Sequence, residues 1–311
     1  MLMRRKLLSA ARRFAAGIDV SAREVRLVIA SRKRRGAHPV RVEWIGAAPL
    51  PPGAMSGMHI VERALVTEAL ASLCARWPRQ LPMRGMPCSM AVPGDAASIS
   101  LSAMTAARAH SNRKVAPSCA LGECEPFLFD GAGQLCGHDA DETRGGASHR
   151  LLQARVEVAA AARIALASVE CEPLAALRAL VHAGEHARIA GQRYGAIWAG
   201  YGGVFGWRIA DRSVEAAIRF PGGEHPDLDA ALRRLAGAGG LHAALVGGDV
   251  ALLDRIGLPL ADIGERLGCS AAPFECAPFG CRPAALTDLE GWKHGAAYAV
   301  AFGLALRGVT Q

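Results

Sequence analysis

The sequence predicts an α/β protein built from two related halves, and three observations support this prediction. Of the 311 residues, 51% are apolar, which is ample for buried cores, and the length allows two domains of roughly 100–200 residues each. Runs that alternate apolar and polar residues, typical of strands, are interleaved with runs of helical periodicity. The same order of expected elements occurs twice, at a separation of roughly 180 residues, which is too long for a solenoid repeat.

The first half is expected to open with three strands, a helix and a fourth strand. Alternation and intervening turns, one of them at the basic run Arg32–Arg35, separate the strands. Helical spacing marks the helix, and Pro93-Gly94 ends the last strand. The order strand, strand, strand, helix, strand is the opening of a ribonuclease-H-like unit. The expected ranges are Gly17–Val20, Val25–Ala30, Val40–Ile45, Ile60–Trp77 (helix) and Ser89–Val92.

The middle of the chain is less regular. Scattered glycines and charges over 106–149 predict a reduced, inserted subdomain with long loops, which extends to about residue 158. Alternation over Leu151–Val158 indicates a strand, and Ala159–Val169 is expected to be a helix. A further helix is expected over Glu172–Ala183, because Pro173 suits a first helical turn.

The second half repeats the opening plan. Three strands, a helix and a buried strand are expected in the same order as before. The repetition predicts a two-lobed fold with a duplicated ribonuclease-H-like core. The expected ranges are Tyr194–Trp198, Val204–Ile209, Ser213–Phe220, Leu228–Ala236 (helix) and Ala243–Val246.

The positive charge is confined to the N-terminus. Residues 1–41 hold 12 of the 36 Lys and Arg residues and two of the 28 acids, which leaves 24 bases against 26 acids elsewhere. A generally basic body is absent, so nucleic acid is excluded as the expected partner. The N-terminal basic residues among Leu and Met could lie on an anionic membrane surface, and a solvated tail is the alternative interpretation. These candidate membrane-surface residues are Arg4, Arg5, Lys6, Arg12 and Arg13.

Metal binding and disulfide formation are not expected. The nine cysteines include no Cys-x-x-Cys pair, so reduced cytosolic thiols are the simplest interpretation. Cys119, Cys124, Cys136 and His138 lack the tight paired spacing of a metal site. His182–His186 matches the His-x-x-Glu-His pattern of inverted zinc proteases. Because Gly184 interrupts it after the expected end of a helix, a surface loop is favoured. No apolar run reaches the length of a bilayer span.

The chain contains three glycine-rich turns. They are Gly17–Ser21, which includes Asp19; Trp198–Gly203, which includes Gly200 and Gly202; and Leu245–Asp249, which includes Gly247 and Gly248. Their places resemble those of the nucleotide loops of actin-like ATPases, and this resemblance implies that the first two cradle phosphates with backbone N–H groups and that the third contacts the adenosine, where glycine allows close backbone approach.

Several segments, in order along the chain, resemble the PilM family, the actin-like cytoplasmic component of type IV pilus assembly. They are Gly17-Ile18-Asp19-Val20, Pro49–Gly53, Met90–Gly94, Glu172-Pro173-Leu174-Ala175, Val246-Gly247-Gly248 and Ala299–Arg307. The cytoplasmic domain of the type II secretion protein GspL has the same architecture. The resemblance implies an actin-like fold, ATP and magnesium bound between two lobes, and a grip on the cytoplasmic tail of a PilN-like inner-membrane partner.

The chain departs from the family's nucleotide loops in two places. Ser21 replaces a second glycine and is followed by Ala22-Arg23-Glu24, whose carboxylate would repel phosphate unless a metal or Arg23 offsets it. Trp198 stands where the second loop usually carries an Asp that holds magnesium or orients water. Weak or absent ATP and magnesium binding is therefore expected, with only vestigial roles for Asp19, Ser21, Gly200, Gly202, Gly247 and Gly248, and no catalytic residue.

Together these observations predict a pilus scaffold at the cytoplasmic side of the inner membrane. The expected organisation is a basic tail over 1–15, a first actin-like lobe over 16–185 and a second over 186–311. The expected partners are a PilN-like tail and other platform proteins. An active actin-like ATPase or kinase, or the equivalent component of a type II secretion platform, is the alternative function.

Overall fold

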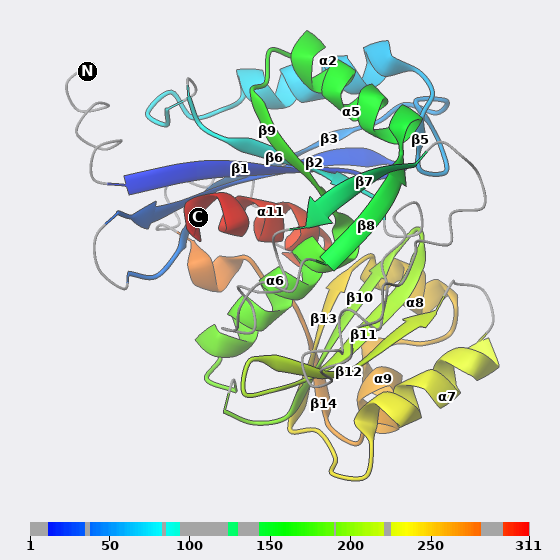
Figure 1. Cartoon of the computed structure of the whole chain (residues 1–311). Helices are drawn as coiled ribbons and strands as arrows, with labels where there is room; N and C mark the ends of the chain where they lie inside the picture. Colours follow the sequence, from blue (N-terminus) through cyan, green and yellow to red (C-terminus); the bar gives the residue numbers. More distant parts are fainter. Residues whose placement is uncertain are drawn as a thin grey trace. The chain divides into compact units, whose positions relative to one another are not determined.

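Two five-stranded sheets form the framework of the computed structural model (Figure 1). Contacts divide the chain into a first unit, residues 1–91, 150–175 and 275–311, and a second unit, residues 92–149 and 176–274. The predicted division at residue 185 stays a prediction, because contact density and sequence duplication divide a chain by different criteria. The structure describes residues 12–34, 38–82, 85–93, 124–129, 143–189, 191–220, 225–280 and 295–310.

The sheet of the first unit has the strand order β3-β2-β1-β6-β9. Strands β1 and β2 are antiparallel, as are β2 and β3, whereas β6 runs parallel to β1. Successive side chains of a strand point to opposite faces, so each face can bury its own apolar set. The strands are β1 (Arg12–Val20), β2 (Glu24–Lys33), β3 (Arg41–Pro49), β6 (Cys88–Val92) and β9 (Leu166–Cys171).

Helices cover both faces of this sheet (Figure 1). α2 (Arg63–Ala75) and α5 (His149–Ala161) pack with Ile18, Leu27 and other buried residues on one face. α11 (Ala299–Thr310) packs against β1 on the other face, where the backbone of Ala301 approaches Gly17. The shorter elements are β4 (Met55–Ser56), β5 (His59–Ile60), η1 (Ala277–Phe279) and η3 (Gly295–Tyr298).

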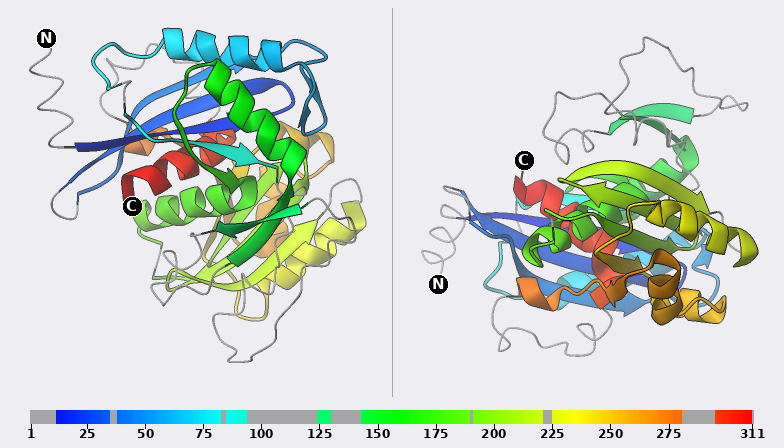
Figure 2. Two further views of the ribbon diagram at one scale, coloured as in Figure 1. Left: turned by 45° about the horizontal axis from the view of Figure 1, so that its top comes forward. Right: turned by 90° about the horizontal axis from the view of Figure 1, so that it is seen from below.

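The sheet of the second unit repeats this plan with the order β12-β11-β10-β13-β14. β10 is antiparallel to β11 and parallel to β13, as β1 is to β2 and β6. Apolar residues of α7 and α9 form a core with one face of the sheet, and Figure 2 shows α7 (yellow) in two further views. The elements are β10 (Tyr194–Gly200), β11 (Gly203–Ala210), β12 (Ser213–Phe220), α7 (His225–Ala236), β13 (Ala243–Gly248), α8 (Val250–Arg255), α9 (Leu260–Leu267) and β14 (Ser270–Pro273).

Two elements complete the path of the chain. An antiparallel hairpin, β7 (Cys124–Phe129) with β8 (Thr143–Ser148), belongs to the second unit. α6 (Glu172–His186) begins in the first unit and ends in the second. Apart from this hairpin and α5, the inserted subdomain that the sequence predicts lies outside the described residues.

The duplicated α/β plan is confirmed, but two predicted elements are wrong. Leu151–Val158 is helical in α5, and the strand β9 follows it, so the order of strand and helix predicted there is reversed. The buried residues of α5 follow helical spacing, but one of them is Arg155, whose polar character suggested alternation. The basic run predicted as a turn is strand through Lys33.

Two further elements are longer than expected. α6 continues to His186, so the His-x-x-Glu-His segment is helical and not a loop; Gly184 lies in it against the ring of Tyr194. β1 begins at Arg12, and Phe14 is buried, so the strand takes in the end of the predicted basic tail. Among the residues that the structure describes, no helix is long and apolar enough to cross a bilayer.

Candidate functional site

The first glycine turn lies in the first unit, between β1 and β2. Ser21 closes the turn: its Oγ donates to the carbonyl of Glu24 at 2.9 Å and accepts from the Glu24 N–H at 3.2 Å. The Ser21 N–H donates to the same carbonyl at 3.0 Å. A short hydroxyl side chain commonly closes such turns, and here its oxygen occupies the Glu24 N–H, a donor that a phosphate would otherwise use.

Asp19 stands just before this turn and is only 4% exposed. It is the cross-strand partner of Arg26, whose Nη1 lies 3.1 Å from Asp19 Oδ2. The Nε of Arg26 donates to Glu24 Oε1 at 2.7 Å. Arg26 therefore binds both acids of the hairpin, and it is Arg26, not Arg23, that offsets the charge of Glu24.

Burial and pairing act in opposite directions on the Asp19 carboxyl. Burial raises the pKa of Asp19 above its usual range, and the charge and hydrogen bond of Arg26 offset this only in part. Burial lowers the pKa of Arg26, but the charges and hydrogen bonds of Asp19 and Glu24 hold this pKa above its ordinary value. The guanidinium thus stays charged and remains a fixed cation beside Asp19.

A second buried guanidinium belongs to Arg155 of α5, which is fully buried. Its Nε donates to the carbonyl of Ala91 at 2.5 Å and its Nη1 to that of Leu151 at 3.1 Å. Its Nη2 has no hydrogen-bond partner among the described residues. Burial lowers the pKa of Arg155, and the charges of Glu172 and Asp19 oppose this. The charge of Arg155 therefore acts on Glu172 more than on Asp19, whose main cationic partner is Arg26.

In the second unit, Trp198 fills the space beside the second glycine turn. The residue is 3% exposed, and its ring centroid lies 5.7 Å from that of Phe205. A Cβ on Gly200 would lie 2.3 Å from Trp198 Cη2, so the indole covers this glycine directly. Gly200 pairs with Gly203 in the β10–β11 hairpin, and Gly202 between them is buried. An apolar ring thus takes the place of the carboxylate expected in the family.

The third glycine turn lies next to the second, because β10 and β13 are parallel neighbours. Gly248 has a φ of +92°, and a Cβ there would lie 1.9 Å from the carbonyl oxygen of Ala199. The Asp249 N–H donates to this oxygen at 2.8 Å, and the Asp249 side chain caps α8 through the Leu252 N–H. Gly247, the residue before Gly248, is buried at the end of β13. The glycine at 248 is required by this close backbone packing.

The structure distributes the six predicted nucleotide-loop residues over both units. Asp19 and Ser21 belong to the first unit; Gly200, Gly202, Gly247 and Gly248 lie on adjacent strands of the second. The residues at the first turn do not fit a magnesium ion, since Asp19 is buried and already pairs with the guanidinium of Arg26 at 3.1 Å. At the second turn, position 198 is a tryptophan and offers no carboxylate to a metal. No nucleotide step is therefore assigned to these residues.

Arg26 and Arg155 were not expected as site residues. Arg26 could have been found from the sequence, because a tight turn at Ser21–Glu24 sets Asp19 opposite Arg26 in an antiparallel hairpin. No sequence pattern indicated Arg155 as a site residue, because the segment that contains it was predicted as a strand and not as the helix α5.

The other candidate residues have ordinary structural roles or lie outside the described part of the chain. Glu185 of the His-x-x-Glu-His segment forms an ion pair with Arg212 at 2.6 Å. Within the described ranges no group of His, Cys, Asp and Glu could hold a metal ion. Arg12 donates to Ser31 Oγ at 2.7 Å. Residues outside the description are Arg4, Arg5, Lys6, Cys119, Cys136 and His138.

The duplicated α/β architecture is a fold that the chain shares with a solved structure. The chain is similar to a solved PilM–PilN type IV pilus biogenesis complex, with a TM-score of 0.63, 14% identity, and coverage of 95% of this chain and 98% of that chain. No protein-family model matches the chain, and no curated protein sequence matches it.

Two further solved structures are more distant. The ethanolamine utilization protein EutJ from Carboxydothermus hydrogenoformans gives a TM-score of 0.43 and 13% identity over 94% of this chain and 89% of its own. A protein of actin-like ATPase fold from Bacteroides thetaiotaomicron gives 0.44 and 8% over 85% and 92%. Likenesses at this level carry no functional argument.

Proposed function

We propose that this chain is a cytoplasmic scaffold of a type IV pilus machine, held at the inner membrane by the cytoplasmic tail of a PilN-like protein. The observation that supports this most strongly is the similarity to the PilM–PilN complex over 95% of the chain. The family segments that the sequence contains, in order from Gly17 to Arg307, support the same role independently.

The proposal includes the loss of efficient ATP hydrolysis. Hydrolysis in this fold class needs a metal and an oriented water, commonly worth several kcal/mol of transition-state stabilisation. Here Arg26 is 3.1 Å from the Asp19 carboxylate before the first turn, and Trp198 provides no acid at the second. The Arg26 guanidinium beside Asp19 opposes the entry of a divalent metal by charge repulsion.

The experiment is a calorimetric titration of purified full-length chain with the cytoplasmic tail peptide of a PilN-like protein from the same organism. Binding at micromolar affinity, worth about −8 kcal/mol, is expected, and a scrambled peptide of the same composition should not bind. Failure of the native peptide to bind, with the chain shown to be folded by circular dichroism, would overturn the scaffold proposal.

An active ATPase or kinase is the second candidate, because Asp19 keeps its position at the end of β1. Magnesium-dependent ATP turnover that Asp19→Ala abolishes would establish it. Turnover unaffected by Asp19→Ala would indicate a contaminating enzyme. A type II secretion platform is the third candidate, and the identity of the tail peptide that binds would distinguish it from a pilus machine.

A further inference from the structure

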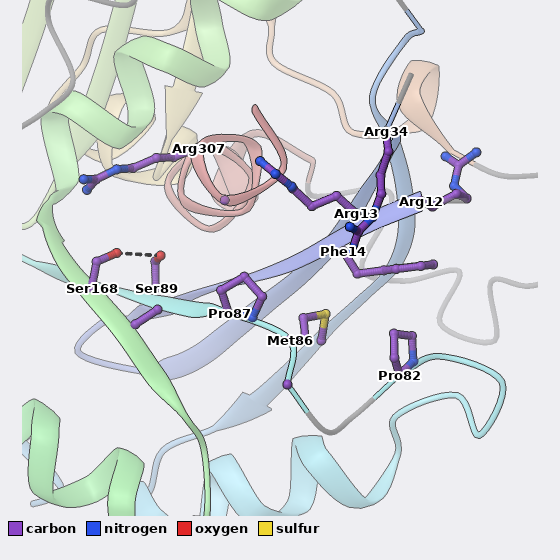
Figure 3. Close-up of a pocket in the computed structure, with 13 residues that line it drawn as sticks. Arg12, Arg13, Phe14, Arg34, Pro82, Met86, Pro87, Ser89, Ser168 and Arg307 are labelled. Carbon is purple, nitrogen blue, oxygen red and sulfur yellow. Dashed lines mark hydrogen bonds between the residues drawn. The ribbon is translucent and has the colours of Figure 1, made fainter. Parts of the chain in front are cut away.

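A pocket of about 560 Å³ in the first unit is rich in arginine. It lies between the start of β1, the segment before β6, strand β9 and the end of α11 (Figure 3). Four arginines and two serines line it, and no Asp or Glu is among its lining residues. These six residues are Arg12, Arg13, Arg34, Ser89, Ser168 and Arg307.

The arginines differ in how far their charges are neutralised. Arg12 lies 3.6 Å from Glu43, and Arg307 lies 3.7 Å from Glu170. The side chains of Arg13 and Arg34 form no ion pair or hydrogen bond with any described residue. Figure 3 shows the four arginine side chains pointing in different directions, with Arg12 on the opposite side from Arg307. The charges of Arg13 and Arg34 therefore supply most of the local positive potential that favours an anion.

Arg307 adds an unsatisfied donor. Its side chain is only 14% exposed, and its Nε is buried without a hydrogen-bond partner among the described residues. Most buried polar groups have a partner, so an orphaned donor on the wall of a pocket points to a missing acceptor. In Figure 3 the Arg307 side chain lies on the same side of the pocket as the two serines.

The serines supply neutral donors. Ser89 Oγ and Ser168 Oγ are 2.8 Å apart on the adjacent strands β6 and β9, and Ser89 is buried. Only one of the two hydroxyl protons is used in this hydrogen bond, so the pair retains one proton for a ligand.

We propose that this pocket binds the phosphate group of an organic phosphate, independently of the scaffold function. A phosphate monoester carries a charge of about −1.5 to −2 at neutral pH and three acceptor oxygens, which can engage several guanidinium groups and a hydroxyl together. A carboxylate offers two oxygens and one charge and would leave most of these donors unused. Apolar side chains of Phe14, Met86 and Pro87 line the pocket beside the charges and suit the organic part of such a ligand.

The phosphate has two potential sources, a soluble phosphorylated molecule or the headgroup of an anionic phospholipid. The first is tested by calorimetric titration of the full-length chain with glycerol 3-phosphate. The second is tested by co-sedimentation with phosphatidylcholine vesicles with and without phosphatidylglycerol. Binding of glycerol 3-phosphate identifies a soluble ligand, whereas binding only to the phosphatidylglycerol vesicles identifies the headgroup.

The test variant is Arg13→Gln/Arg34→Gln, since neither side chain has a partner among the described residues whose loss would disturb the fold. The matched control is Arg150→Gln/Arg234→Gln, which removes the same charge from two exposed helical positions away from the pocket. The pocket variant should lose at least about tenfold in affinity, and the control should keep it. Equal loss in both variants, or no binding of either probe to the wild-type chain, would overturn the proposal.

Discussion

Asp19 and Arg26 face each other across the first hairpin, and their environment determines what this turn can bind. The carboxylate is buried, and burial raises its pKa even with a guanidinium 3.1 Å away. Removing a charge from water costs more than a single pairing returns unless the remaining lone pairs are also satisfied. Burying the charged pair therefore carries a net electrostatic cost, and the packing around the pair offsets this cost.

The raised pKa predicts a pH-dependent difference between the wild-type chain and Asp19→Asn. Below the unfolded value of 3.8, Asp19 is protonated in both states. As the pH rises from there through the folded pKa, the unfolded chain ionises first, so the wild-type folded state loses stability. The amide of the variant cannot ionise. The variant should therefore have the larger unfolding free energy at pH 7. The difference in unfolding free energy between the two chains should become smaller toward pH 4.

Urea unfolding of both chains across this pH range measures the difference. Asp254→Asn, at an exposed position, is the control and should show no comparable trend. A wild-type chain that is more stable than Asp19→Asn at pH 7 would mean that the pairing with Arg26 outweighs burial.

Arg26→Met tests the same pair from the other side. Removal of one partner leaves a buried, unpaired carboxylate, and the cost of such a change is about 3–5 kcal/mol. Because an amide needs no counter-charge, Asp19→Asn/Arg26→Met should recover most of that loss. A double-mutant cycle from urea unfolding gives the coupling directly. Equal losses in the single and double variants would show that Arg26 stabilises the hairpin by packing alone.

At the scale of elements, the packing of α11 against β1 explains a glycine that the sequence associated with nucleotide binding. A Cβ on Gly17 would lie 2.0 Å from the carbonyl oxygen of Ala301 and 2.7 Å from Leu304 Cβ. The same helix approaches the backbone of Ala175 at Gly303 and the side chain of Ala15 at Gly308. Small residues on the helix and the strand therefore allow the two backbones to come into contact. Gly17, the first residue of the first glycine turn, lies at this contact.

Gly17→Ala should accordingly destabilise the chain strongly. The clash is with backbone, which cannot rotate away, so we expect a loss at or above the upper end of the usual overpacking cost of about 1–3 kcal/mol. Thermal or urea unfolding measures it. Gly191→Ala is the matched control, because a Cβ at position 191 meets nothing within 4 Å. A Gly17→Ala chain as stable as this control would show that α11 can move away from β1 at little cost.

The elements predicted correctly are those with a strong periodic pattern. Strands β1, β2 and β10 to β13 alternate or are apolar throughout, and the repeated order of strands and helices predicted the duplicated fold. The prediction of α5 failed because one of its core positions is Arg155, and a buried charge has no signature in a hydrophobicity pattern. The candidate site was predicted as a set of turns. Trp198 and Gly200 are two residues apart in β10 and share one face of the strand, so the covering of Gly200 follows from the strand period once the strand is assigned through Gly200.

At the scale of the whole molecule, part of the N-terminal positive charge lies in strand β1. Of the five basic residues assigned to a membrane surface, Arg12 and Arg13 lie in β1 and line the arginine pocket. The positive charge of residues 1–41 is thus partly built into the first unit and not only carried by a tail. Local concentration of charge in an otherwise balanced chain favours a specific anionic ligand over general adhesion to polyanions.

The scaffold and enzyme proposals differ in which ligand stabilises the whole chain. A ligand that binds only the folded state at about 100 times its Kd raises the unfolding free energy by about 2.7 kcal/mol. The PilN-like tail peptide at that concentration should therefore raise the midpoint of thermal unfolding by several degrees. Magnesium and ATP should leave it unchanged, because Arg26 opposes a metal at Asp19 and Trp198 supplies no acid. The scrambled peptide, and ATP without magnesium, are the controls. Stabilisation by magnesium and ATP but not by the native peptide would reverse the assignment and identify the chain as a nucleotide-dependent member of the actin-like fold.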